Sequence, residues 1–323
     1  MILINRTEND PYFNIAAEEY VLKVFHQDVF MLWVNSPSVI IGKHQNAVAE
    51  TDIMYTFKNH IPVVRRISGG GTVYHDEGNL NYSLVVNGEQ GKLVDYLKYA
   101  GTVIRTLERL SVKAVLEGKS SLFTAGKKFS GNAEHVFRNR VLHHGTLLFN
   151  TDPEMLRNCI RPAHTAYDDK SVRSVDSKTT NLARHLAGDF SMEDLRNALI
   201  KQVMLDFRDV SSYSFTEKDR AAIQKLVDEK YSGLEWNFGY SPKYVLNRNM
   251  WIGDQAVKVS LKTEKGILSS LQVSIDGEEM DEISARLIGI MHHPGPVLDV
   301  LNKFNFASIT KNISPEAFLT ALF

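Results

Sequence analysis

The sequence predicts a mixed α/β (α+β) protein made of two unequal domains. Three observations predict this fold. Short apolar runs typical of strands alternate with amphipathic stretches typical of helices over most of the chain, an aromatic turn-rich segment at 236–242 interrupts the pattern, and a compact α+β unit follows it. We therefore expect a first domain over 1–243 and a second over 244–323. A chain of 323 residues is long enough for both.

Composition limits the classes of protein to which the chain can belong. The hydrophobic fraction of 43% and the charged fraction of 23% are those of an ordinary globular protein. A net charge of −1 gives no overall positive field for binding nucleic acid. Cys159 is the single cysteine, which favours a reducing compartment. With no signal-peptide pattern and no long apolar run, we expect a cytoplasmic protein that binds neither nucleic acid nor membranes.

The first half of the chain predicts one helix at the N-terminus, a series of strands and a second helix. Asn9 and Asp10 can cap a helix in which Pro11 takes the first turn. Apolar runs predict strands over 30–34, 38–41, 63–67, 72–75, 80–86 and 112–116. We expect the first two strands to pair, and the fourth and fifth to form a hairpin with Gly78 in the left-handed conformation. An amphipathic pattern predicts a helix over 92–110.

The second half predicts a strand block, helices and a polar loop before the C-terminal unit. Strands turn at Gly126 within 122–149, and helices begin near Pro153, Ser191 and Thr216. The polar segment 161–180 is typical of a mobile functional loop or of a disordered one. In the C-terminal unit we expect a strand meander that turns at 264–266, followed by helices near Ile283, Val297 and Ser314.

The segment 65–81, RRISGGGTVYHDEGNLN, is the strongest candidate for a binding site. Gly69, Gly70 and Gly71 carry no Cβ, so their backbone can touch a ligand and point N–H groups at an anion. Arg66 could bind a phosphate or carboxylate through two parallel hydrogen bonds. A glycine run alone favours a plain loop between strands, but the flanking arginines favour an anion site.

A second cluster, GKKFSGN at 126–132, places a lysine beside small residues. On a strand, Lys128 and Ser130 share one face while Lys127 and Phe129 share the other. If Phe129 packs inward, Lys128 projects into the space above the small residues that follow it. A pair of solvated strand lysines is the alternative interpretation.

Three other reactive side chains attract attention for different reasons. His143 and His144 are neighbours on a strand and point to opposite faces, so they cannot share a zinc ion. We expect one to line a site and the other to pack. Cys159 lies on a predicted helix without small residues around it, which favours a buried thiol over a nucleophile.

Together these motifs resemble the lipoate–protein ligase family. The similar segments are RRISGGGTVYHDEGN, GKKFSGNA, HHGTLLFN, SVRSVDSKTTNL and EWNFG, which extend over almost the whole chain. The resemblance implies a catalytic domain with mixed sheets and flanking helices, shared with biotin–protein ligases, and a small α+β accessory domain. It implies an AMP-forming ligase of lipoate salvage, which activates lipoate or octanoate with ATP and then lipoylates a lysine of a lipoyl domain. The implied acceptors are E2 subunits of 2-oxoacid dehydrogenases and the glycine cleavage H protein.

The resemblance also implies roles for individual residues. Lys128 would be the catalytic lysine, bridging the lipoyl carbonyl and the α-phosphate. ATP or the adenylate would be bound by Arg66, Gly71, Thr72, Val73, Tyr74 and Lys128. Lipoate would be bound by Ser68, Gly69, Gly70, His75, Asn79, His144 and Lys128. A mobile loop containing Ser171, Val172 and Arg173 would close over the adenylate.

Two positions depart from the family pattern. Ser120-Ser121 stands where the family often has Asn-Asp, whose carboxylate would be a natural magnesium ligand, so Mg²⁺ is expected with ATP at an unassigned position. His135 stands where an arginine is common. Three alternatives stay open: an ATP-independent octanoyl or lipoyl transferase that uses a cysteine, a biotin–protein ligase, and a non-catalytic adenylate-binding homologue. Against the first two, 117–124 contains no cysteine and the biotin-specific glycine–arginine loop is absent.

We predict that Lys128→Ala abolishes activation of the acid, because the two anions then meet without the lysine charge that bridges them. Cys159→Ala should leave activation nearly unchanged. Pyrophosphate release from ATP measures both variants, and a loss of activity in the cysteine variant would favour the transferase instead.

Overall fold

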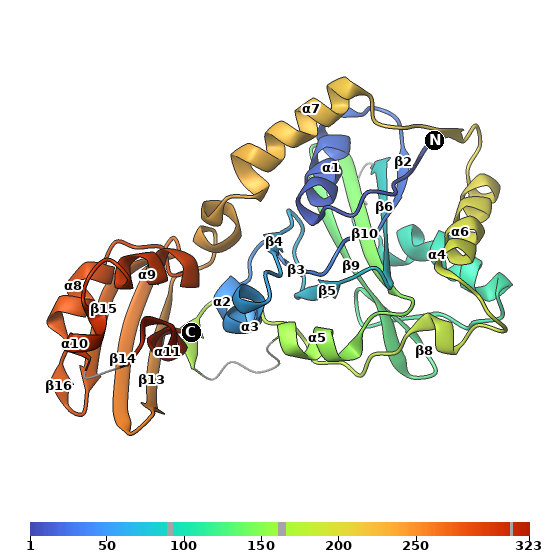
Figure 1. Cartoon of the computed structure of the whole chain (residues 1–323). Coiled ribbons are helices and arrows are strands. Elements are labelled where there is room, and N and C mark those ends of the chain that lie inside the picture. The colour runs from blue at the N-terminus through green and yellow to red at the C-terminus, as the bar shows by residue number, and fades with distance from the viewer. Residues whose placement is uncertain (89–92, 161–165, 311–312) are drawn as a thin grey trace.

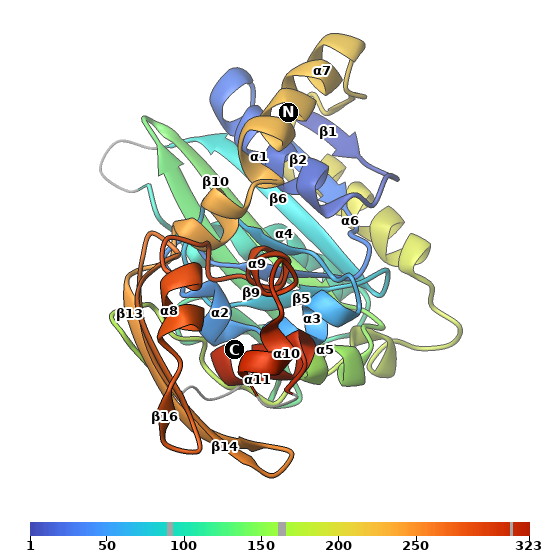
Figure 2. The ribbon, with the colours of Figure 1, turned by 60° about the vertical axis from the view of Figure 1, so that its left-hand side comes forward.

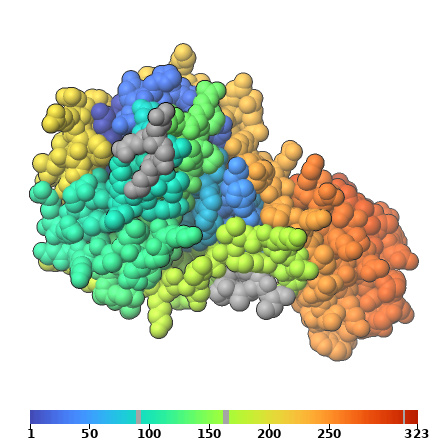
Figure 3. Space-filling model, turned by 180° about the vertical axis from the view of Figure 1, so that it is seen from behind, coloured from blue at the N-terminus to red at the C-terminus, as the bar shows by residue number. Residues whose placement is uncertain are grey.

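The chain folds into a large body and a smaller C-terminal body, which Figure 1 shows side by side. The computed structural model describes residues 1–88, 93–160, 166–310 and 313–323. The expected helix start at Lys92 and the first five residues of the expected loop, 161–165, lie outside the described residues. Seen from behind, the C-terminal body protrudes at one side of the large body (Figure 3).

A mixed central sheet forms the large body. Within the described residues its strands, in spatial order, are β12 (Ser211–Ser212), β1 (Ile2–Asn5), β2 (Val29–Trp33), β6 (Asn79–Asn87), β10 (Arg140–Leu148), β9 (Lys127–Phe137), β8 (Ser121–Thr124) and β7 (Val115–Glu117). The pairs of β1 with β12 and β2 are parallel, and the pairs from β2 to β7 are antiparallel.

The two faces of the central sheet are covered by different helices. One face packs against α4 (Tyr96–Arg109) and α6 (Met192–Asp206) through Phe30, Leu84 and their neighbours. The other face packs against α1 (Pro11–Val24) and α7 (Glu217–Leu226) through Met31, Val85 and Leu142. Because strand residues alternate between faces, the polar residues Asn79, Asn81 and Ser83 of β6 fall on the α1 side.

A small sheet lies beside the central sheet and corrects two expectations. Its strands in the described chain are β4 (Val63–Arg65), β3 (Ser38–Ile41) and β5 (Val73–His75), in that order. The expected pairing of the first two strands is wrong, because β2 lies between β1 and β6 whereas β3 lies between β4 and β5.

The expected hairpin around Gly78 is also wrong. Residues 76–78 carry the chain from β5 of the small sheet to β6 of the central sheet, and these strands do not pair. Gly78 does not have a positive φ. Glycine is needed there for close approach instead, since a Cβ would lie 2.1 Å from the carbonyl oxygen of Asn150.

Most helix starts and turns are confirmed. The Asp10 side chain accepts hydrogen bonds from the N–H groups of Tyr12 and Phe13 at the start of α1. The helix starts at Ser191 and Thr216 are confirmed, and each forms a capping box with an aspartate three residues later. Gly126 has a φ of +70° in the turn between β8 and β9. Shorter helical segments are α2 (Ala47–Glu50), α3 (Ile53–Lys58), α5 (Pro153–Cys159), η1 (Leu182–Arg184), η2 (Val227–Tyr231) and η3 (Glu235–Gly239).

The C-terminal body is an antiparallel sheet covered by helices (Figure 2). The described strands are, in order, β11 (Tyr167–Asp169), β13 (Tyr244–Ile252), β14 (Gln255–Glu264), β15 (Ile267–Ile275) and β16 (Glu278–Glu279). The helices are α8 (Asp281–Leu287), α9 (Pro294–Leu301), α10 (Phe306–Ile309) and α11 (Pro315–Leu322). The expected meander is confirmed.

Strand β11 was not expected from the sequence. It comes from the polar loop before α6, yet it pairs with β13 at the edge of the C-terminal sheet. One apolar cluster also continues from Val39 and Tyr74 into Leu246 and Val257 of that sheet. The sheet's main strands begin one residue after the expected boundary, which stays a prediction. Among the described residues, none of the helices combines the length and apolar character needed to cross a membrane.

Arg65 ties the small sheet and residues 42–45 to the segment that leads into the C-terminal body. Its side chain is fully buried, and its Nη1 donates to the carbonyl oxygens of Gly42, Lys43 and Gln45 at 2.8–3.1 Å. Its Nη2 donates to the carbonyl oxygen of Asn237 at 2.7 Å, in the segment that leads to β13. Burial lowers the pKa of this guanidinium to about 9.

We predict that Arg65→Ala destabilises the protein by more than about 3 kcal/mol, because it leaves several buried carbonyl oxygens without donors. Chemical denaturation followed by circular dichroism measures the change. Arg109→Ala, which removes an exposed arginine from the end of α4, is the control and should change stability by less than about 0.5 kcal/mol. Equal effects of the two substitutions would contradict the structural role of Arg65.

Candidate active site

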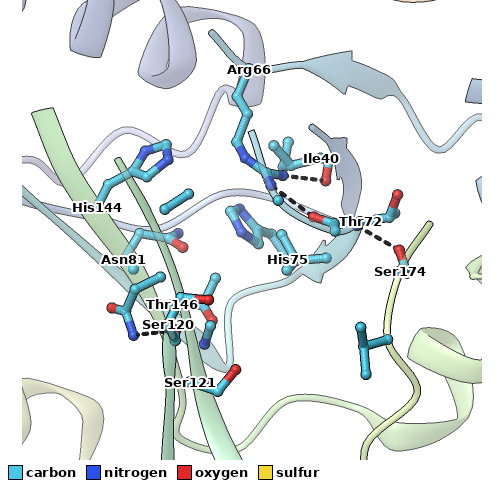
Figure 4. Close-up of a pocket in the computed structure, with 18 of the residues that line it drawn as sticks. Ile40, Arg66, Thr72, His75, Asn81, Ser120, Ser121, His144, Thr146 and Ser174 are labelled. Atoms are coloured by element: carbon cyan, nitrogen blue, oxygen red, sulfur yellow. Dashed lines mark hydrogen bonds between the residues drawn. The ribbon is translucent and has the colours of Figure 1, made fainter. Parts of the chain in front are cut away.

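A cavity of about 300 Å³ lies between the central sheet and the small sheet. Figure 4 shows His144 and Asn81 on the central sheet, Arg66 and His75 on the opposite wall, and Ser174 at one side. The sequence-predicted site residues that line the cavity are Arg66, Gly70, Gly71, Thr72, Val73, His75, Lys128, His144, Val172 and Arg173. The structure therefore brings together the glycine motif, the lysine strand, one histidine and the polar loop.

Five of the expected residues lie behind the wall or beside it. Tyr74 points into the apolar core on the other face of β5. Asn79 Nδ2 donates to Asn81 Oδ1 at 2.8 Å, and Ser171 N donates to Asp169 Oδ1 at 2.8 Å. Ser68 and Gly69 both accept hydrogen bonds from Arg66.

Arg66 shapes the glycine loop from within. Its Nη2 donates to the carbonyl oxygens of Gly69 at 2.6 Å and Gly71 at 2.7 Å, and its Nη1 donates to the carbonyl oxygen of Ile40 at 3.1 Å. Burial lowers the pKa of Arg66 to about 10. In this conformation the guanidinium organises the loop, and its influence on an anion in the cavity is through its charge. Gly70, with a φ of +87°, makes the tight loop possible.

Lys128 extends over Gly131 on the same strand, where its Nζ would lie 3.4 Å from an added Cβ. The register of β8 on β9 shifts so that Leu122 opposes Ser130 and Phe123 opposes Lys128. This bulge corrects the expected alternation, because Lys128 shares the cavity with Gly131 whereas Ser130 is buried away from it. Burial, and then the positive charge of Arg66, lower the pKa of the Lys128 ammonium.

The histidine pair divides as expected. His144 lines the cavity, whereas His143 is fully buried and its Nδ1 lies 2.9 Å from Glu134 Oε1. On the facing wall, burial lowers the pKa of His75 to about 3, so this imidazole is neutral. Its Nδ1 lies 3.1 Å from Asn35 Nδ2, which can only donate.

Residues 172–175, here called the strap, cross the side of the cavity next to the glycine loop. Ser174 Oγ accepts from Thr72 N at 2.9 Å and from Gln45 Nε2 at 3.1 Å. It donates to Glu50 Oε2 at 2.5 Å, and burial raises the pKa of that carboxyl. The hydroxyl of Ser174 therefore binds the strap to the backbone N–H of Thr72, directly after the three glycines.

Sequence reasoning missed several residues of this site. Trp33, Asn81 and Thr146 line the cavity on successive neighbouring strands, where the register places Asn81 opposite both others. The alternating polar residues of NLNYS on an apolar strand were a usable signal for Asn81. Nothing local marks Glu50 or Ser174, because their contact joins segments 124 residues apart.

The described part of the cavity lining offers no carboxylate ligand for the expected magnesium ion. Among the described residues that line the cavity there is no aspartate or glutamate, and no group of three or more His, Cys, Asp or Glu side chains is placed to hold a metal ion. Ser120 and Ser121 do line the cavity, so the departure noted in the sequence falls within the site.

The cavity combines an apolar part with fixed positive charge. Ile15, Trp33 and Ile40 supply apolar surface, and Lys128 and Arg66 supply the charge. Such a site suits an acid with an apolar chain, and the charge would also attract a phosphate.

Comparisons with known proteins point to one family. The model of the lipoyl protein ligase A/B catalytic domain matches residues 10–204. Lipoate-protein ligase LplJ of Bacillus subtilis is 32% identical over 330 residues, covering 100% of both chains. A bi-partite lipoate protein ligase from Thermoplasma acidophilum, described with its E2 lipoyl domain, has a TM-score of 0.64 at 26% identity over 74% of this chain and 96% of its own. A lipoate-protein ligase A bound with ATP has a TM-score of 0.62 at 28% identity over 74% and 98%.

We predict that Lys128 loses its proton at a lower pH than the ordinary lysine value of 10.5, because burial and Arg66 both disfavour its charge. NMR of ¹³C-labelled lysine measures this pKa, with the signal assigned by its loss in Lys128→Arg. Pyrophosphate bound beside the ammonium should raise the pKa again. A pKa at or above 10.5 in the free protein would contradict the partial burial of this side chain beside Arg66.

Proposed function

The chain belongs to the lipoyl protein ligase A/B family, and we propose that its cavity is where lipoate is activated with ATP. The chain is a lipoate–protein ligase of the ATP-dependent class. The observation that carries the assignment of the site is the position of Lys128, a partly buried ammonium that shares one cavity with the glycine loop and with apolar side chains. The apolar part would hold the acyl chain, and Lys128 would hold the carboxylate.

The first step joins two anions, so the site must offset their repulsion. A carboxylate oxygen of lipoate attacks the α-phosphorus of ATP, and pyrophosphate leaves with the electrons of the broken P–O bond. Lys128 would bridge the acid and the α-phosphate and stabilise the negative charge that builds up there. Gly71, Thr72 and Val73 would contact the nucleotide, and Arg66 adds positive charge from behind the loop.

The second step transfers the acyl group. The amine of an acceptor lysine attacks the carbonyl carbon of lipoyl-AMP, AMP leaves, and an amide forms with loss of the amine proton. We propose that the acceptor is a lipoyl domain of an E2 subunit or the H protein. The Thermoplasma relative supports this choice, because it is described with its E2 lipoyl domain.

The strap would control access to the nucleotide side of the cavity. Ser174 occupies the N–H of Thr72, where an oxygen of the nucleotide is expected, so the strap and the ligand would rearrange together. The expected Mg²⁺ stays a prediction. We also propose a cytoplasmic location, where ATP is present and thiols stay reduced.

The transferase alternative requires a reactive cysteine, and the geometry of Cys159 argues against it. The thiol is fully buried on α5 and does not line the cavity. Burial raises its pKa to about 12, which keeps it protonated and poorly nucleophilic.

We predict that the purified protein exchanges pyrophosphate with ATP only when lipoate or octanoate is present, because the acid supplies the attacking oxygen. Incorporation of labelled pyrophosphate into ATP measures the exchange, and Lys128→Ala is the matched inactive control. Acyl transfer from an acyl-carrier protein without ATP, in place of exchange, would contradict the ligase assignment.

A further inference from the structure

A buried hydrogen-bond network of polar side chains runs from α1 to the glycine loop, behind the cavity wall. Glu18 is 1% exposed, and its Oε1 lies 2.8 Å from His144 Nδ1. His144 Nε2 lies 2.6 Å from Ser68 Oγ. Ser68 Oγ in turn accepts from Arg66 Nε at 3.0 Å. Two members of this network, His144 and Arg66, line the cavity. Glu18 and Ser68 do not, so they act on the cavity through these neighbours.

The hydrogen-bond directions in this network follow from the groups at its two ends. The Glu18 carboxylate can only accept, which favours a proton on His144 Nδ1. The Arg66 guanidinium can only donate, so Ser68 Oγ accepts at that end and can donate its own proton to His144 Nε2. That nitrogen then carries no proton, and the imidazole proton lies on Nδ1, facing the Glu18 carboxylate. The opposite tautomer would make Ser68 accept twice and deprive its proton of this acceptor.

Glu18 is held so that it can impose this tautomer. Both of its oxygens lie within 2.9 Å of His144 Nδ1, and its Oε1 also accepts from Ser83 Oγ at 2.6 Å. Ser83 Oγ accepts in turn from Trp33 Nε1 at 2.9 Å. The carboxylate therefore connects two residues of the cavity lining, Trp33 on β2 and His144 on β10.

The part of the cavity affected is the part away from the strap. Figure 4 shows His144 on one side and the contact of Thr72 with Ser174 on the other, with His75 between them. His144, which Glu18 holds, is thus separated from Thr72, which is expected to contact the nucleotide. Trp33 belongs to the apolar surface that would receive an acyl chain.

We propose that Glu18 is a positioning residue for the acid substrate, which fixes the His144 tautomer and so the wall that receives the acyl chain. This inference rests on the proposed function for the identity of the substrate. Its structural part, the tautomer, does not depend on that function and can be tested separately.

The first experiment is Glu18→Gln, which keeps the shape of the side chain but replaces one acceptor oxygen with a donor. ¹⁵N-labelled histidine spectra should show His144 as the Nδ1–H tautomer in the parent protein and as a mixture in the variant. In pyrophosphate exchange, KM for lipoate should rise roughly tenfold, the size expected for loss of a hydrogen bond to a charged group, while KM for ATP stays within about twofold.

Two further variants separate positioning from general damage. Glu19→Gln removes the neighbouring carboxylate of α1, which bonds to Lys23 and Lys230 away from the cavity, and should leave KM for lipoate unchanged. Ser68→Ala removes the hydrogen bond to His144 Nε2 and should raise KM for lipoate, while the Nδ1–H tautomer persists. If the Glu18→Gln variant does not fold, Ser68→Ala still tests the proposal.

An unchanged tautomer in Glu18→Gln would overturn the proposal, and so would equal rises of both KM values. No rise in KM for lipoate in Ser68→Ala would overturn it as well. If the parent protein shows no lipoate-dependent exchange but the tautomer shifts as described, the proposed function fails while the control of His144 by Glu18 stands.

Discussion

The architecture of this protein depends on two buried guanidinium groups at adjacent positions. Arg65 and Arg66 leave the end of β4 in different directions, and both donate mainly to backbone carbonyl oxygens. Burying a charge is costly unless its hydrogen bonds are satisfied, so each arginine requires the loops around it to keep one arrangement. Arg65 thereby holds the segment that leads into the C-terminal body, and Arg66 holds the glycine loop.

The same burial determines the electrostatics of the cavity. Arg66 lies close enough to Lys128 to lower its pKa, and with no carboxylate among the described lining residues this positive potential is not cancelled inside the cavity. Glu18 favours the charged form of Arg66 from behind the wall. The site is therefore preorganised for anions before they arrive, which is the arrangement that lowers the barrier for bringing two of them together.

The sequence was sufficient to predict elements defined by local chemistry. Asp10, Ser191 and Thr216 cap their helices with their own side chains, and His143 and His144 separate because a strand alternates. The sequence was not sufficient where contacts between distant segments determine which strands pair. Two apolar runs could not reveal that β2 and β3 join different sheets, and three residues near 168 could not reveal that they extend a sheet formed after residue 243.

The candidate site follows the same division. The glycine motif, Lys128 and His144 were visible in the sequence because their chemistry is unusual for a strand or loop. Glu18 was not, because a carboxylate on a helix is ordinary until the fold places it 2.8 Å from His144. A buried carboxylate must be paired with hydrogen-bond donors. Burial of Glu18 therefore requires its neighbours to point their protons at its oxygens. Residues of this kind have no local sequence signal, but in the fold all their hydrogen bonds are made. They fix the positions of the side chains that line the cavity.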